Sequence, residues 1–124
     1  MKKLTLIFGL FICLTAHSKE FNSNKTYTGT WNNQTSDWDF SESKEINSII
    51  SIKDSSVYID DVKRVTLTSP SVQSPSKNYK GTEWYFSDEL GQEGIMTIAE
   101  YISGRKTITF CYDSKLYTYY IQQK

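Results

Sequence analysis

Acidic residues beside aromatic residues are the first feature of this sequence that suggests chemistry. One group of acids surrounds Trp38, and a second surrounds the run Trp84-Tyr85-Phe86. The acids of the two groups are Asp37, Asp39, Glu42, Glu83, Asp88, Glu89 and Glu93. A glycosidase needs two carboxylates that face one cleft at a set separation. Acids at the ends of strands are usually solvated, so we interpret both groups as surface charge rather than as a catalytic pair.

The first 18 residues have the order of a secretory signal peptide. Lys2 and Lys3 precede a nearly unbroken apolar run from Leu4 to Leu14, and small residues precede a cut after Ser18. The apolar run of about 11 residues is too short to span a bilayer, which takes about 20. We therefore expect export to the periplasm or the medium, followed by a single domain over residues 19–124.

Residues 19–124 lack the side chains that most catalytic and metal sites need. They contain no His and a single Cys, Cys111, so neither a Ser-His-Asp nor a Cys-His arrangement can be built. A His-based zinc site and a disulfide within the chain are excluded for the same reason. Neither Asp60-Asp61 nor the Asp88–Glu93 segment matches a known calcium loop. We expect no enzyme activity, no cofactor and no metal ion.

Charge, hydropathy and the single Cys argue against a nucleic-acid partner, a membrane-spanning helix and a nucleophilic thiol. The whole chain carries 14 basic and 14 acidic residues, and this balance gives no electrostatic case for nucleic acid. No segment after the first 18 residues is apolar enough to cross a membrane as a helix. Cys111 lies in a strong strand pattern, and we interpret it as a small buried hydrophobic residue rather than a nucleophile. We expect a monomer.

The rest of the chain has the pattern of an all-β domain. Short runs rich in β-branched and aromatic residues alternate with Asp, Ser, Gly and Asn. In one run, Ile108, Phe110 and Tyr112 share a face, as expected for a half-buried antiparallel strand. The predicted strands are Thr26–Asn32, Asp37–Ser41, Glu45–Lys53, Val57–Asp60, Val62–Thr68, Thr82–Ser87, Gly94–Ile102, Lys106–Tyr112 and Lys115–Gln122.

Turns and one long loop separate these strands. Ser103-Gly104, Asp113-Ser114 and Asp54-Ser55-Ser56 are short and polar, which predicts tight hairpins. The Glu42–Glu45 stretch has room for one helical turn, and no segment predicts a long helix. Ser69–Gly81 holds both prolines and four serines, and we expect this loop to be disordered rather than functional.

About eight short antiparallel strands favour a small up-and-down β-barrel, with a two-sheet β-sandwich as the alternative. The segment Thr28-Gly29-Thr30-Trp31 resembles the first strand of lipocalins and fatty-acid-binding proteins, and Thr28–Gln34 is similar to the start of the avidins. In these calycin-type families the Trp packs across one end of a closed barrel. The resemblance therefore implies a barrel with Trp31 inside it, and it implies no particular ligand.

Aromatic residues are the candidates for binding. The side chains chosen on this basis are Trp31, Trp38, Trp84, Tyr85 and Tyr101. Trp84 shares a strand face with Phe86, so we expect it to line the interior with Trp31. Two functions follow: an exported protein that holds a small apolar ligand inside the barrel, or an exported protein-interaction module. The second, an inhibitor or envelope component, would act through the Tyr-rich last strand and the 69–81 loop.

Overall fold

A computed structural model describes residues 19–74 and 76–123 of the chain, and these residues form ten strands and no helix. The predicted signal peptide lies outside the described residues. The strands are β1 (Lys19–Asn32), β2 (Asp37–Phe40), β3 (Lys44–Lys53), β4 (Ser56–Ile59), β5 (Lys63–Leu67), β6 (Val72–Gln73), β7 (Tyr79–Asp88), β8 (Glu93–Tyr101), β9 (Lys106–Cys111) and β10 (Lys115–Gln123).

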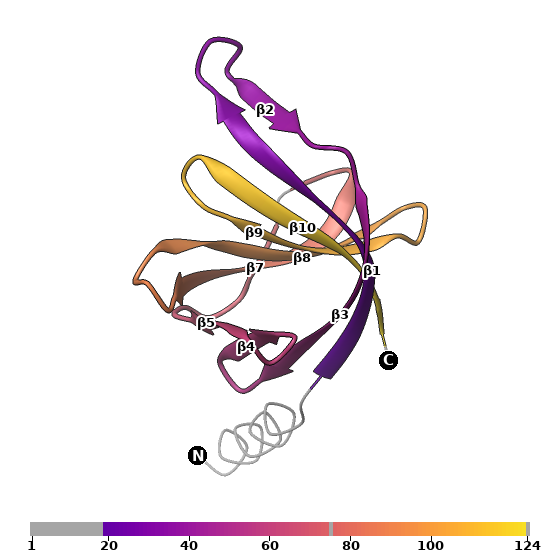
Figure 1. Cartoon of the computed structure of the whole chain (residues 1–124), viewed down its shortest axis with the longest axis vertical. Helices are drawn as coiled ribbons and strands as arrows, with labels where there is room; N and C mark the ends of the chain where they lie inside the picture. Colours follow the sequence, from indigo (N-terminus) through magenta and orange to yellow (C-terminus); the bar gives the residue numbers. More distant parts are fainter. Residues whose placement is uncertain (1–18, 75, 124) are drawn as a thin grey trace, which may run out of the picture.

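Eight of these strands close into an antiparallel up-and-down barrel (Figure 1). Each strand from β3 to β10, apart from β6, pairs with its neighbour along the chain, and β10 then pairs with β1. The closing pair runs from Phe21 opposite Gln123 to Thr30 opposite Lys115. The predicted barrel is therefore confirmed, and the sandwich alternative is wrong. The three predicted tight turns all connect neighbouring strands.

The first strand is longer than its sequence pattern predicts, because it has two partners on one side. Its first part pairs with β3 as far as Thr26 opposite Lys44, and its last part pairs with β2. Ser41 joins the two partners: its backbone N–H donates to the Thr28 carbonyl at 2.8 Å, and its Oγ accepts from the Thr28 N–H. Lys44 and Glu45 belong to β3, so the helical turn expected at 42–45 is wrong.

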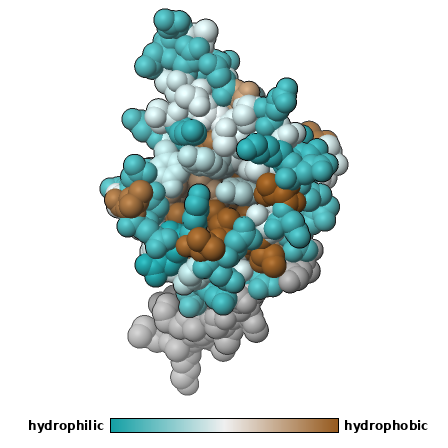
Figure 2. Space-filling view, in the orientation of Figure 1, coloured by the Kyte–Doolittle hydropathy of each residue, from teal (hydrophilic) through white to brown (hydrophobic). Residues whose placement is uncertain are grey.

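The hairpin of β1 and β2 projects beyond the barrel, at the top of Figure 1. In the same orientation, Figure 2 shows hydrophilic residues over the end of this hairpin. Hydrophobic residues gather lower down, in the middle of the visible face.

The Ser69–Gly81 segment is ordered along β7, so the expected disorder is wrong for the residues described here. Within it, β6 pairs with Glu83 and Thr82 of β7, and the Ser74 N–H donates to the Gly81 carbonyl at 2.9 Å. The Tyr85 N–H donates to Ser69 Oγ at 2.9 Å. Since β5 stops at Leu67, these bonds give the exposed edge of β7 the partners that its backbone needs.

Inward-facing side chains fill most of the barrel. Nine buried residues form one cluster: Phe21, Ile50, Val57, Val65, Phe86, Met96, Ile108, Phe110 and Ile121. Phe86 and Met96 are 0% exposed, and they are diagonal neighbours on the inner face because the Phe86–Gly94 pair lies two residues along from the Trp84–Met96 pair. Gly94 allows this packing, since a Cβ there would lie 2.7 Å from the Phe86 ring and 2.5 Å from the Cys111 carbonyl oxygen.

Candidate functional site

One end of the barrel is left open as a cup of about 760 Å³. The start of β5, the turn from β7 to β8 and the turn from β9 to β10 surround its mouth. Its wall and floor are mainly apolar or aromatic: Ile59, Val65, Leu90, Phe110, Tyr112, Tyr117 and Tyr119. Its charged residues are Lys63, Arg64, Asp88, Glu89, Glu93, Asp113 and Lys115. Ligand pockets in proteins usually measure about 300–1,000 Å³, so the cup is large enough for a small molecule.

Two neighbouring strands supply the aromatic wall. Alternation along β9 points Phe110 and Tyr112 inward, and Tyr117 lies opposite Phe110 on β10. The ring centroids of Phe110 and Tyr119 are 6.1 Å apart, as are those of Tyr112 and Tyr117, and both pairs are edge-to-face. The buried Phe86 ring contacts both Phe110 and Tyr112, with centroids 5.7 and 5.2 Å away. The wall is therefore fixed to the core beneath it.

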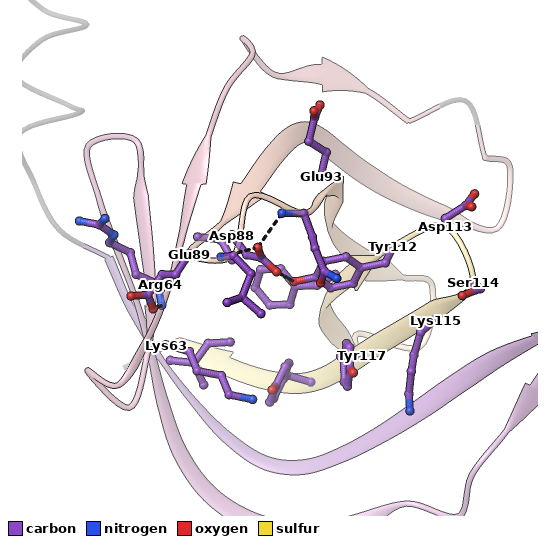
Figure 3. Close-up of a pocket in the computed structure, with 16 residues that line it drawn as sticks. Lys63, Arg64, Asp88, Glu89, Glu93, Tyr112, Asp113, Ser114, Lys115 and Tyr117 are labelled. Atoms are coloured by element: carbon purple, nitrogen blue, oxygen red, sulfur yellow. Dashed lines mark hydrogen bonds between the residues drawn. The ribbon is translucent and has the colours of Figure 1, made fainter.

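The Asp88 carboxylate holds the rim in shape (Figure 3). Its Oδ2 accepts a hydrogen bond from the Tyr112 hydroxyl at 3.0 Å, and its Oδ1 accepts from the N–H groups of Leu90 and Gln92 at 2.9 and 2.8 Å. Burial alone would raise the pKa of Asp88, but the bonds from Gln92, Tyr112 and Leu90 outweigh it and lower that pKa. Asp88 therefore stays ionised and ties the β7–β8 turn to β9.

Two tyrosines of the cup, Tyr112 and Tyr119, stay protonated at neutral pH. Burial raises the pKa of Tyr112, and its hydrogen bond to Asp88 and the charge of that group raise it further. Burial also raises the pKa of Tyr119, with smaller contributions from Asp60 and Tyr117. Each of these two phenols is therefore a hydrogen-bond donor in the physiological range.

The sequence candidates lie elsewhere. Trp31 and Trp38 face each other on the projecting hairpin, with ring centroids 5.4 Å apart at 74°. Trp31 is 37% exposed and lies one residue beyond the last β1–β10 pair, so its expected position inside the barrel is wrong. The reason is that β1 continues past the barrel by pairing with β2.

The other three candidates are also separate from the cup. Trp84 packs against the core on the same strand face as Phe86, as expected, but it is not among the residues that line the cup. Tyr85 is on the outer face and 62% exposed. Tyr101 packs against Tyr79, with centroids 5.3 Å apart, and the Arg105 guanidinium lies 4.8 Å from its ring centroid. The structure brings Trp31 and Trp38 together and leaves the other three apart.

Sequence reasoning missed the aromatic wall, although a signal for it exists. Phe110 and Tyr112 alternate on one strand, Tyr117 and Tyr119 alternate on the next, and only Asp113-Ser114 separates the two strands. A tight hairpin places these four rings on one face.

Cys111 is half-buried on the outer face, between Ile95 and Leu116, rather than within the core. Its thiol donates a weak hydrogen bond to the Tyr112 carbonyl at 3.4 Å. Burial raises the pKa of this thiol.

Comparisons of this chain with protein-family models, with curated proteins and with solved structures found no match. Residues 19–74 and 76–123 include no helix long and apolar enough to cross a membrane. Over the same described ranges, no three His, Cys, Asp or Glu side chains are grouped so that they could hold a metal ion. The function of the cup therefore has to be inferred from its own geometry.

Proposed function

We propose that this protein is an exported binding protein that holds a small, largely apolar ligand in the cup at one end of its barrel. The observation that carries the proposal is the cup itself: about 760 Å³, walled by four aromatic rings and placed above a filled core. The rim also supports it, because three hydrogen bonds to Asp88 fix the β7–β8 turn before any ligand arrives. Such preorganisation lowers the entropic cost of binding.

The proposal places the ligand in the cup and not along the whole barrel. Phe86, Met96 and Ile108 are fully buried below the cup and leave the middle of the barrel occupied. The likeness to lipocalins, fatty-acid-binding proteins and avidins supports the proposal through the closed barrel alone, since Trp31 does not cover the barrel end.

A titration with a neutral, polarity-sensitive dye such as Nile red tests this proposal. We expect saturable binding with one site per chain, weakened at least tenfold by Tyr117→Ala, which removes part of the wall. Tyr85→Ala is the matched control, because Tyr85 is 62% exposed on the outer face and far from the cup lining. Circular dichroism checks that both variants are folded. Binding that Tyr85→Ala weakens and Tyr117→Ala leaves unchanged would place the ligand elsewhere.

A second candidate function is the protein-interaction module, and one observation favours it. Cross-strand pairing aligns one residue from each of β2, β1, β10, β9, β8 and β7 in a row on the outer face: Phe40, Gly29, Leu116, Cys111, Ile95 and Tyr85. Phe40, Ile95 and Tyr85 are 58%, 37% and 62% exposed. Ile95 and Tyr85 are direct neighbours, whereas the buried Leu116 and the half-buried Cys111 lie between them and Phe40. Exposed apolar residues on one face are a feature of interaction surfaces.

Site-directed photo-crosslinking tests this second function. A crosslinker at position 85 is expected to trap one defined protein that a crosslinker at Lys53, the last residue of β3, does not trap. With that protein purified, Ile95→Asp is expected to raise the Kd at least tenfold. Equal trapping at both positions, or an unchanged Kd, would exclude the row as a binding surface.

A further inference from the structure

We propose that the ligand of the cup is a compact aromatic anion, and that Lys63 binds its anionic group at the mouth. This inference rests on the proposed binding function and deepens it by naming the class of ligand. It follows from three properties of the described residues: the depth of the cup, the geometry of its rings, and the direction of the charges around it.

The depth of the cup favours a compact ligand over a long chain. Its inner end is closed by the Phe110–Tyr119 pair of the aromatic wall, whose rings are in contact, and Phe110 also contacts the fully buried Phe86. Phe110 itself is only 3% exposed. An extended alkyl chain entering from the mouth would meet this layer and could not pass along the barrel axis.

The rings of the wall favour a planar aromatic ligand. The pairs Tyr112–Tyr117 and Phe110–Tyr119 are edge-to-face, at 89° and 82°. Each pair therefore presents a ring edge beside a ring face, which are the two surfaces that an added aromatic ring packs against best. Aliphatic side chains, Ile59 and Val65, supply the apolar part of the wall opposite.

Hydrogen bonds already occupy the acidic side chains nearest the ligand. Asp88 accepts three bonds, from Tyr112, Leu90 and Gln92. Glu89 Oε1 accepts from the Arg64 N–H at 3.0 Å, which joins the β7–β8 turn to β5. These bonds hold both carboxylates in the rim, where they shape the mouth of the cup.

The remaining acids near the mouth are directed elsewhere. Figure 3 shows Glu93 and Asp113 pointing away from the cup. Asp60 lies near Tyr119 and contributes to the raised pKa of that phenol, but its Oδ1 accepts from the Ile49 N–H at 2.8 Å. Of the acids around the cup, Asp88 is the one that Figure 3 shows turned into it, and its two oxygens already accept three hydrogen bonds.

Cationic groups are placed to meet an anion. In Figure 3, Lys63 extends from β5 across the mouth toward β10, whereas the Arg64 guanidinium points away. The Lys115 ammonium lies 5.9 Å from the Tyr117 ring centroid, at the opposite side of the mouth. A carboxylate held here would receive charge-assisted bonds.

Three ligands of one shape test the inference: 2-naphthoate, the neutral 2-naphthamide, and the cationic 2-naphthylmethylammonium, each titrated by calorimetry. Decanoate is the chain-shaped anion for comparison. We expect naphthoate to bind at least tenfold more tightly than the other three. Lys63→Gln is expected to remove the tenfold preference for naphthoate over naphthamide and to leave the affinity for naphthamide unchanged. Lys53→Gln is the control, because Lys53 is exposed at the end of β3 and lies outside the cup lining.

The possible results separate this inference from the proposed function. If naphthamide binds as tightly as naphthoate, or if the cation binds best, the role of Lys63 is refuted while the cup remains a binding site. If decanoate binds more tightly than naphthoate, the aromatic class is refuted. If all four ligands and the neutral dye fail to bind folded protein, the proposed function fails as well. A loss of naphthoate binding in Lys53→Gln equal to that in Lys63→Gln would attribute the preference to net charge alone.

Discussion

Replacing Phe86 with alanine tests whether the floor of the cup is as closely packed as the structure shows. The side chain is 0% exposed, and truncation of a buried Phe to Ala typically costs about 3–5 kcal/mol. Its ring also makes edge-to-face contacts with Phe110 and Tyr112, and each such pair contributes about 0.5–1.5 kcal/mol. The typical cost of truncating Phe already includes contacts of this kind, so they place Phe86→Ala at the upper end of its range, a loss of about 4–5 kcal/mol in the free energy of unfolding.

Urea denaturation measures this loss. With an m-value of about 2 kcal/mol/M, a loss of about 4 kcal/mol moves the unfolding midpoint down by about 2 M. Tyr85→Ala, on the outer face, should move the midpoint far less. The space left by Phe86 lies directly under the cup, so decanoate, which the intact floor excludes, should bind the folded variant. A loss below about 1 kcal/mol, with no gain in decanoate binding, would refute the packed floor.

Three further outcomes are expected. Gly94→Ala should cost about 1–3 kcal/mol, measured as a lower Tm, because the added methyl meets a backbone carbonyl and the Phe86 ring; an unchanged Tm would contradict this crowding. The folded-state pKa of Asp88 is lowered, so its stabilising effect is present above its unfolded pKa of about 3.9 and is lost as the pH falls through the folded-state value. In Asp88→Asn, the free energy of unfolding should therefore fall less steeply as the pH is lowered below about 4. An identical fall in the variant and the original protein would count against the three hydrogen bonds to Asp88. The raised pKa of Cys111 predicts slow labelling by a thiol reagent at pH 7, and labelling as fast as in urea would disprove its partial burial.

The barrel could be predicted from sequence because the patterns that indicate its strands and hairpins are local. Ile108, Phe110 and Tyr112 alternate along one strand, and the polar pairs at Ser103-Gly104 and Asp113-Ser114 mark the hairpins on either side. Both signals depend on a few neighbouring residues. The pairing of β6 is different: Val72 and Gln73 form a strand only because β5 ends at Leu67 and leaves part of β7 without a partner.

The position of the cup could not be predicted from sequence, because the register of strand pairing decides which side chains point into it. The last strand carries aromatic residues on both faces, and pattern alone does not decide whether Tyr119 or Tyr120 points inward. The pairing of Tyr119 with Ile108 decides it, since Ile108 is fully buried. Trp31 illustrates the same problem, because its position depends on where the β1–β10 ladder stops.

The closing pair of strands determines the order in which the barrel can fold. All other neighbours in the barrel from β3 to β10 are joined by short connections or by the β6 segment, whereas β1 and β10 come from opposite ends of the described chain. Contacts between distant parts of a chain form slowly, because the chain loses the entropy of closing a long loop before these contacts stabilise it. Until β10 is in place, β1 and β9 each present a bare hydrogen-bonding edge, which invites pairing with another molecule. A chain cut short before Lys115 would keep both edges permanently, so it should aggregate rather than fold into a smaller barrel.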